Sequence, residues 1–199
     1  MPNPPEMAPL VRSLGDADPS QREAAAQEIF RRGRELVRAT AQSWLGDPDL
    51  ARLLASGELH SPEITVGVAV EPEAFERIRS ANGSPRLANV PPDQDAKEFE
   101  LHCAGGVCLD ILTTNDRGGA GAIARYLQKF GEGIQQIELV TQNVDQATEI
   151  LRKRFSLEPI YPQTRAGAGG TRVNFFLVPT QGGKKILVEL VEAASPTKR

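Results

Sequence analysis

Hydrophobic and polar residues alternate with a period of two through most of the chain after residue 63, which predicts β-strands. The stretch ITVGVAV is the first such segment, and EPEAFERIRS, with its apolar positions at helical spacing, follows it. Two further alternating segments, KEFELHC and VCLDILT, meet at Ala104-Gly105-Gly106, which is typical of a hairpin turn. The predicted strand, helix and three strands of this first half lie at residues 64–70, 71–80, 87–90, 97–103 and 107–113.

The same order of elements returns after a predicted linker helix at residues 120–130. Asn143 or Asp145 is expected to cap the helix of this second half, because a side-chain oxygen there accepts from free amides of the first turn. The strand, helix and three strands are expected at residues 134–140, 143–155, 157–162, 171–178 and 184–191. Two β-α-β-β-β units therefore form a predicted α+β module over residues 61–194.

The residues before this module have helical periodicity instead. Apolar residues precede a GDADP break, and a second helix is expected to start there with Asp18 or Ser20 as its cap. Further helices are expected at residues 35–45, ending at a Gly-Asp-Pro, and at residues 49–55.

The DADP turn followed by an R-E-A-A helix resembles a HEAT-type repeat, of which one copy is visible. Solenoids need about three copies to bury a continuous core. A generic helical hairpin is the alternative. In either case we expect a helical cap over residues 1–60 that packs on the module or on a partner, and a tail at residues 195–199.

The composition is ordinary for a globular protein, with 40% hydrophobic and 25% charged residues among 199. A net charge of -3 supplies no basic surface, so nucleic acids and anionic membranes are not expected partners. The sequence has no apolar run typical of a signal peptide or a bilayer-spanning helix. A cytoplasmic protein is expected.

Two cysteines and two histidines are present, but their spacing does not match a zinc finger. Cys103 and Cys108 flank the predicted hairpin turn and are expected to be reduced structural thiols. His102 is expected to face solvent, and His60 lies in the linker.

Several segments in the second half match a known pattern in the right order. GGAGAIARYLQKFGEGI is similar to a linker helix followed by G-E-G-[IL], GAGGTRVNFFLVP to G-x-G-G-x-R-[IV]-x-F, and ILVELVE to a closing [VI]-L-[IV]-E-L strand. With these motifs the chain resembles the vicinal oxygen chelate superfamily, the glyoxalase-type fold, and within it the methylmalonyl-CoA epimerases. The resemblance covers about residues 63 to 192 and implies a barrel-like sheet around a cleft.

That family holds a divalent ion with one inward residue from each of four strands, usually His, Glu or Gln, His and Glu. The ion polarises the thioester while glutamates move a proton. The matching positions here are Thr65, Asp110, Gln136 and Glu189, and the second acid-base glutamate falls on Gln94. The resemblance therefore implies Glu189 as a catalytic base and Gln94 as a substrate contact.

The loss of both histidines removes the ligands that suit Co²⁺, Ni²⁺ or Zn²⁺. Because residues two apart on a strand face the same side, Glu138 should lie beside Gln136. One hypothesis is an oxygen-rich site for Mg²⁺, Mn²⁺, Ca²⁺ or Co²⁺, formed by Thr65, Asp110, Gln136, Glu138 and Glu189. The alternative is a water-filled cleft without a metal, in which Glu138 pairs with a basic residue.

The glycine-rich stretch RAGAGGTR at residues 165–172 leads into a strand, so it is not a Walker or dinucleotide loop. Its amides and Arg172 are candidate contacts for a phosphate of a CoA-like ligand. A simple turn is the alternative.

The leading functional hypothesis is a divergent relative of methylmalonyl-CoA epimerase that binds a small acid or acyl-CoA-like ligand, with ordinary epimerisation impaired or replaced. A non-catalytic scaffold that recruits a protein through the N-terminal helices is the second hypothesis. A metal-dependent epimerase or lyase with an oxygen-rich ligand set is the third. A homodimer is compatible with each.

Overall fold

The computed structural model describes residues 4–56, 61–180 and 183–193. The boundary expected after residue 60, the linker residue His60 and the expected tail at 195–199 adjoin or lie outside these ranges. Among the helices described, none is long and apolar enough to cross a membrane.

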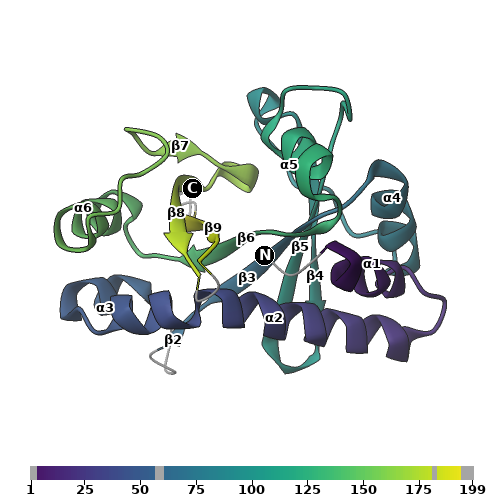
Figure 1. Ribbon diagram of the computed structural model, residues 1–199, viewed down its shortest axis with the longest axis horizontal. Helices are drawn as coiled ribbons and strands as arrows, with labels where there is room; N and C mark the ends of the chain where they lie inside the picture. Colours follow the sequence, from purple (N-terminus) through teal and green to yellow (C-terminus); the bar gives the residue numbers. More distant parts are fainter. Residues whose placement is uncertain (1–3, 57–60, 181–182, 194–199) are drawn as a thin grey trace, which may run out of the picture.

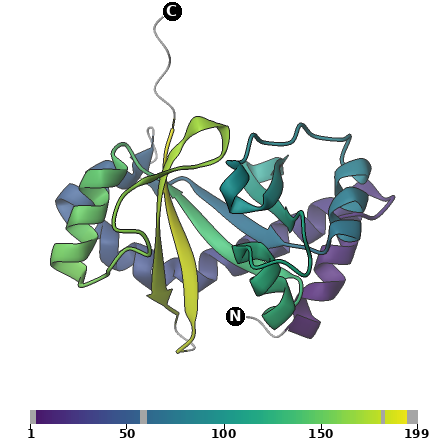
Figure 2. The same ribbon diagram turned by 90° about the horizontal axis from the view of Figure 1, so that it is seen from above.

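A seven-stranded mixed sheet forms the centre of the molecule, in the spatial order β4-β5-β3-β6-β9-β8-β7 (Figures 1 and 2). Its strands are β3 (Ile64–Ala69), β4 (Ala96–Cys103), β5 (Val107–Thr114), β6 (Gly133–Val140), β7 (Arg165–Ala166), β8 (Arg172–Pro179) and β9 (Lys185–Glu192). The first strand of each half pairs in parallel with the last strand of that half, and the two first strands pair with each other antiparallel. This repeated pairing confirms the predicted duplication and the α+β class.

Two of the predicted strands are wrong. Residues 87–90 form no strand, although Ala88 donates one backbone hydrogen bond to Glu98. Residues 157–162 also form no strand, and the short β7 takes that place in the second half. Prolines within or just after both stretches lack the amide that a strand ladder needs, which accounts for the difference.

The N-terminal helices differ from the prediction at one point. They are α1 (Pro4–Ser13), α2 (Pro19–Leu45) and α3 (Pro48–Leu54), followed by a two-stranded ribbon of β1 (Ala55–Ser56) and β2 (Ser61–Pro62). The separate helix expected at residues 35–45 is the second half of α2, which runs without a break. Asp18 caps α2 by accepting the backbone amide of Ser20, as one of the two expected residues.

Helix α2 lies along one face of the sheet (Figure 1) and shares a core with it. Its buried side chains include Ile29, Val37 and Trp44. Gly33 is needed at the crossing, because a Cβ there would lie 2.5 Å from Val66 Cγ2 on β3. The expectation that the helical cap packs on the module is therefore confirmed.

The remaining helices are divided between the two faces of the sheet. They are α4 (Pro72–Ala81), α5 (Ala122–Phe130) and α6 (Val144–Phe155), with short 3-10 turns η2 (Pro92–Gln94), η3 (Ala104–Gly106) and η4 (Ala168–Gly170). Residues of α4 and α6 join the large core with α2, and Asn143 caps α6. Only α5, among the described helices, packs a small apolar cluster against the other face, through Ile123 and Leu127 on Ala69 and Leu112. Most of that face is left for a cavity.

Candidate functional site

An acid-lined cavity of about 470 Å³ occupies the face of the sheet that α5 leaves uncovered. Carboxyl groups from four strands line its floor: Glu98 and Glu100 on β4, Asp110 on β5, Glu138 on β6 and Glu189 on β9. The strand register brings these groups together, since Glu100 pairs with Asp110 and Glu138 with Glu189. Apolar and aromatic side chains, including Ile160, Tyr161 and Phe175, line the cavity as well.

Gln136 is at the centre of the acidic cluster. Its amide nitrogen donates to Glu189 Oε2 at 2.7 Å and to Glu138 Oε1 at 3.1 Å. Gly67 on β3 makes room for this side chain, because a Cβ there would lie 2.5 Å from Gln136 Cγ. The side chain of Gln136 therefore fits against β3 only because residue 67 is a glycine.

A β-bulge brings a second glutamine to the same cavity. The pairing of β3 with β6 shifts between Gly67 and Val68, so that Gln135 is the extra residue. Both Gln135 and Gln136 consequently line the cavity, although neighbours on a regular strand would face opposite sides. The buried Oε1 of Gln135 has no hydrogen-bond partner within the described residues. Such an atom is a candidate acceptor for a ligand N–H or O–H.

Burial changes the acid-base chemistry of the cluster. Loss of solvation, followed by repulsion from neighbouring carboxylates, raises the pKa of Glu98 to about 7. Burial raises the pKa of Glu138 to about 7 as well, against the opposing effect of the Gln136 hydrogen bond. Burial and the same neighbours raise the pKa of Asp110 and Glu189 well above the ordinary values. The cluster therefore retains protons near neutrality, which allows several carboxyl groups to lie close together.

The structure brings four predicted site residues together in this cavity, namely Asp110, Gln136, Glu138 and Glu189. Gln94 lines it too, and its amide donates to the carbonyl of Ala166 at 3.1 Å. Arg165 forms an ion pair with Asp93 beside it. These contacts connect the loop of the first half with the loop of the second half at the edge of the cavity.

Two predicted site residues do not line the cavity. The hydroxyl of Thr65 hydrogen-bonds the thiol of Cys108 instead. Arg172 forms ion pairs with Asp145 and Glu192. Because side chains alternate along β8, the strand directs Arg172 toward α6 while Phe175 faces the cavity. The arginines that line the cavity are Arg125 and Arg165, neither of which was among the predicted site residues.

Glu98 and Glu100 were also missed. The signal was present in KEFELHC, where residues two apart share a face and Asp110 lies on the next strand. Gln135 carried no such signal, because a bulge is not visible in a pattern of period two.

The residues at the family's metal positions do not form a complete ligand set in this arrangement. Thr65 is turned to Cys108, and Gln136 presents a donor nitrogen to the carboxyl groups. Asp110 Oδ1 is buried without a hydrogen-bond partner in the part of the chain described, and it is the one atom here that favours a cation. An oxygen-rich metal site would need the Gln136 amide to turn over and the cluster to lose protons, so it stays a prediction.

A second cavity, of about 720 Å³, adjoins the first between α5 and the hairpin of β8 and β9. Its lining is mainly apolar and includes the exposed side chains of Phe130 and Leu177. Basic residues line it as well, namely Arg125, Lys129, Lys184 and Lys185. The residues common to both cavities are Ala122, Arg125, Gln135 and Leu187. Gln135 therefore lies at the junction between an acidic space and an apolar space with basic groups.

The duplicated sheet, curled around a cavity that four of its strands line, is the glyoxalase-type fold of the vicinal oxygen chelate superfamily. Within that superfamily the structure is similar to methylmalonyl-CoA epimerases. The enzyme from Mycobacterium tuberculosis shares 28% sequence identity, with 73% of this chain and 95% of that chain covered and a TM-score of 0.56. A Streptomyces coelicolor epimerase variant solved with 2-nitronate-propionyl-CoA shares 22% identity, with 66% and 96% covered and a TM-score of 0.52.

A hypothetical protein from Bacillus halodurans is similar at 22% identity, with 68% of this chain and 96% of that chain covered and a TM-score of 0.53. No protein-family model matches the sequence, and no curated protein matches it. The chain therefore shares its fold in outline with these structures at 22–28% sequence identity.

Proposed function

We propose that this protein binds an acyl-CoA thioester, with the acyl end in the acid-lined cavity and the pantetheine arm in the adjoining apolar cavity. The observation that carries the proposal is the buried Oε1 of Gln135, which lies at the junction of the two spaces and has no hydrogen-bond partner among the residues described. A pantetheine arm has amide N–H donors between an acyl end and a phosphorylated end. Similar solved epimerases contain 2-nitronate-propionyl-CoA or methylmalonyl-CoA, which supports the same ligand class here.

Charge also favours a thioester over a free small acid. An acid that enters the cavity as a carboxylate would meet a floor made of carboxyl groups, which is unfavourable. In a thioester the carboxylate of the acid is replaced by a neutral carbonyl bonded to sulfur, so this repulsion is absent. The CoA phosphates would lie on the side of Lys129, Lys184 and Lys185.

The chemistry we propose is proton transfer at the carbon beside the thioester carbonyl. Glu189, the residue that matches the family pattern, is the base on the cavity floor. Burial and the neighbouring carboxyl groups raise its pKa well above the ordinary value, so the proton is accepted by its ionised fraction, to which the Gln136 amide donates. Neutral Asp110 and Glu138 would donate hydrogen bonds to the developing enolate oxygen, as a carboxylic acid kept neutral by burial is able to do. Gln94 cannot act as a base on the other face. Exchange of the proton with solvent is therefore expected to exceed epimerisation.

Titration calorimetry with propionyl-CoA, free propionate and free CoA tests the ligand class. The thioester should bind at least tenfold more tightly than propionate, and free CoA should retain part of the affinity. Equal or tighter binding of propionate would overturn the thioester proposal in favour of a small acid. Absence of heat and of a melting shift with all three ligands would overturn the ligand-binding function.

No observation favours the scaffold hypothesis, because α2 already buries its apolar residues on its own sheet. The metal-dependent epimerase has less support than the thioester-binding proposal, since Thr65 does not line the cavity and its hydroxyl contacts the thiol of Cys108. A cytoplasmic location and a homodimer are expectations for future work on the purified protein.

A further inference from the structure

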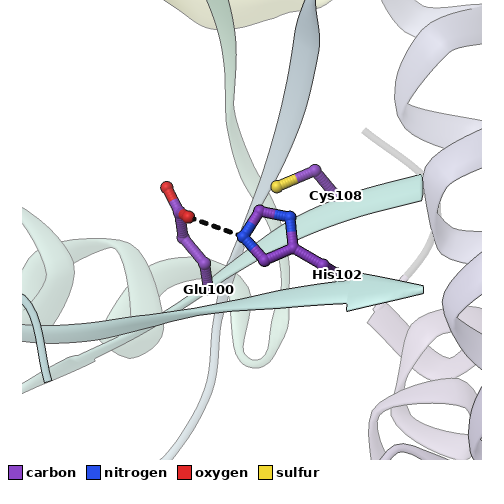
Figure 3. A group of neighbouring side chains, drawn as sticks. All are labelled: Glu100, His102 and Cys108. Carbon is purple, nitrogen blue, oxygen red and sulfur yellow. Dashed lines mark hydrogen bonds and ion pairs between the residues drawn. The ribbon is translucent and has the colours of Figure 1, made fainter. Parts of the chain in front are cut away.

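A cluster of three metal-ligand side chains lies on the hairpin of β4 and β5 (Figure 3), and one of them, Glu100, also lines the acid-lined cavity. His102 and Cys108 are directly opposite each other in the strand register, and Glu100 lies two residues before His102 on the same face. His102 Nε2 lies 2.9 Å from Glu100 Oε2. One ligand atom from each residue lies within 4.8 Å of the others.

We propose that Glu100, His102 and Cys108 form a zinc-binding site. Thiolate, imidazole and carboxylate are each ordinary zinc ligands, and together they select a borderline-soft ion over Mg²⁺ or Ca²⁺. Tetrahedral coordination with bonds of about 2.0–2.3 Å separates ligand atoms by roughly 3–4 Å, so small side-chain rotations suffice. Three protein ligands leave the fourth position for water or another small ligand.

The backbone supports this geometry. Because the cross-strand pair is fixed by the antiparallel ladder, His102 and Cys108 are held near each other whether or not an ion is present. The hydroxyl of Thr65, on the neighbouring strand, contacts the thiol of Cys108. This second contact is the kind of support that orients a ligand in established metal sites.

The surrounding charge and exposure also favour a cation. Glu63 and Glu138 act electrostatically on the thiol of Cys108, in addition to Glu100 within the cluster. Zn²⁺ bound by one thiolate and one carboxylate would be neutral overall, which would relieve this local excess of negative charge. The side chains of His102 and Glu100 are 71% and 58% exposed, so an ion can enter from solvent.

The site differs from the metal positions implied by the family resemblance, because none of its three residues lies at those positions. It also does not depend on thioester binding. Zinc binding and thioester binding can therefore fail or succeed separately.

The test uses the full chain without a histidine tag, titrated with Co²⁺ as a coloured substitute for Zn²⁺ and then with Zn²⁺ in competition. We expect about one equivalent to bind with a sulfur-to-cobalt charge-transfer absorption, as one thiolate ligand requires. Cys108→Ser should abolish the absorption, and His102→Ala should weaken affinity at least tenfold. Cys103→Ser is the matched control, because that thiol contacts Glu23 instead, and it should bind normally.

Circular dichroism of each variant separates lost binding from lost folding. If Cys108→Ser unfolds, Cys108→Ala and the Glu100→Gln variant provide the same comparison. The proposal is overturned if the folded wild-type chain binds less than a tenth of an equivalent, or if Cys103→Ser removes the absorption. It is also overturned if Glu189→Gln removes the metal while His102→Ala retains it, since the ion would then lie in the inner cluster.

Discussion

The amide nitrogen of Gln136 lies 2.7 Å from Oε2 of Glu189, at the position where the epimerase family pattern has a histidine. An imidazole there would bind a metal, whereas this amide donates to two carboxyl groups. The donor keeps Glu189 and Glu138 in one hydrogen-bonded network. Gln136 therefore bridges two carboxyl groups at a position where the sequence resemblance implied a metal ligand.

Replacing that bridge should destabilise the protein. Gln136→Leu removes the donor and leaves buried carboxyl oxygens unpaired, which we expect to cost about 1–3 kcal/mol of unfolding free energy. Urea unfolding of the variant and the wild type at neutral pH measures the difference. An unchanged unfolding free energy would mean that the two hydrogen bonds are not formed in solution.

The acidic cluster should make stability depend on pH. The pKa of Glu138 rises from its ordinary value of 4.5 to about 7 in the folded protein, chiefly through burial. The folded state thus binds the proton more tightly than the unfolded state. The resulting stabilisation is complete below the unfolded pKa and is lost as the pH rises through the folded pKa.

Glu138→Gln should therefore lose less stability than the wild type between about pH 5 and pH 8, as thermal melts at the two values can measure. The control is Glu149→Gln on α6, where hydrogen bonds from Lys153 and Arg152 lower the pKa of Glu149. Glu149→Gln should lose as much stability between these pH values as the wild type does. If the stability of Glu138→Gln fell with pH as much as that of the wild type, the raised pKa of Glu138 would be contradicted.

Close approach of α2 to the sheet predicts a sharp glycine effect. Gly33→Ala places a methyl group 2.5 Å from Val66 Cγ2 and should cost about 1–3 kcal/mol through overpacking, despite the better helix propensity of alanine. Gly118→Ala is the control, because its new methyl group would be 3.5 Å from the nearest atom, Asp116 Oδ1. Equal melting temperatures for the two variants would show that α2 does not pack as described.

The junction between the cavities predicts a binding effect without a large stability effect. Gln135→Leu removes the unpartnered acceptor, and we expect about tenfold weaker binding of propionyl-CoA, equivalent to about 1.4 kcal/mol. Gln128→Leu on the exposed face of α5 provides the control, since Gln128 bonds the carbonyl of Arg117 outside both cavities. If both variants bind as the wild type does, the pantetheine arm does not contact Gln135.

The fold was predictable where local signals and long-range packing agree. Asn143 and Asp18 cap helices as the capping rules predict, and the repeated order of elements indicated the duplicated sheet. The break expected before residue 35 was wrong because Gly33 serves close packing on Val66 and does not end the helix. Propensity alone does not distinguish these two uses of a glycine.

The site was predictable in part for the same reason. Strand parity correctly grouped Gln136 with Glu138, because β6 is regular over these residues. Strand parity did not place Gln135 in the cavity, because that position depends on the bulge. It also did not bring His102 beside Cys108 as a candidate site, because that contact depends on the exact register of the hairpin. Register and bulges arise from tertiary packing, so a single sequence does not specify them.

Deuterium incorporation at the carbon beside the thioester carbonyl of propionyl-CoA, followed by mass spectrometry in D₂O with a chelator present, tests the central claim most directly. We predict incorporation by the wild-type protein well above background, and at least a hundredfold loss in Glu189→Gln with thioester binding retained. No incorporation above background at high protein concentration, or an equal rate in Glu189→Gln, would contradict the account.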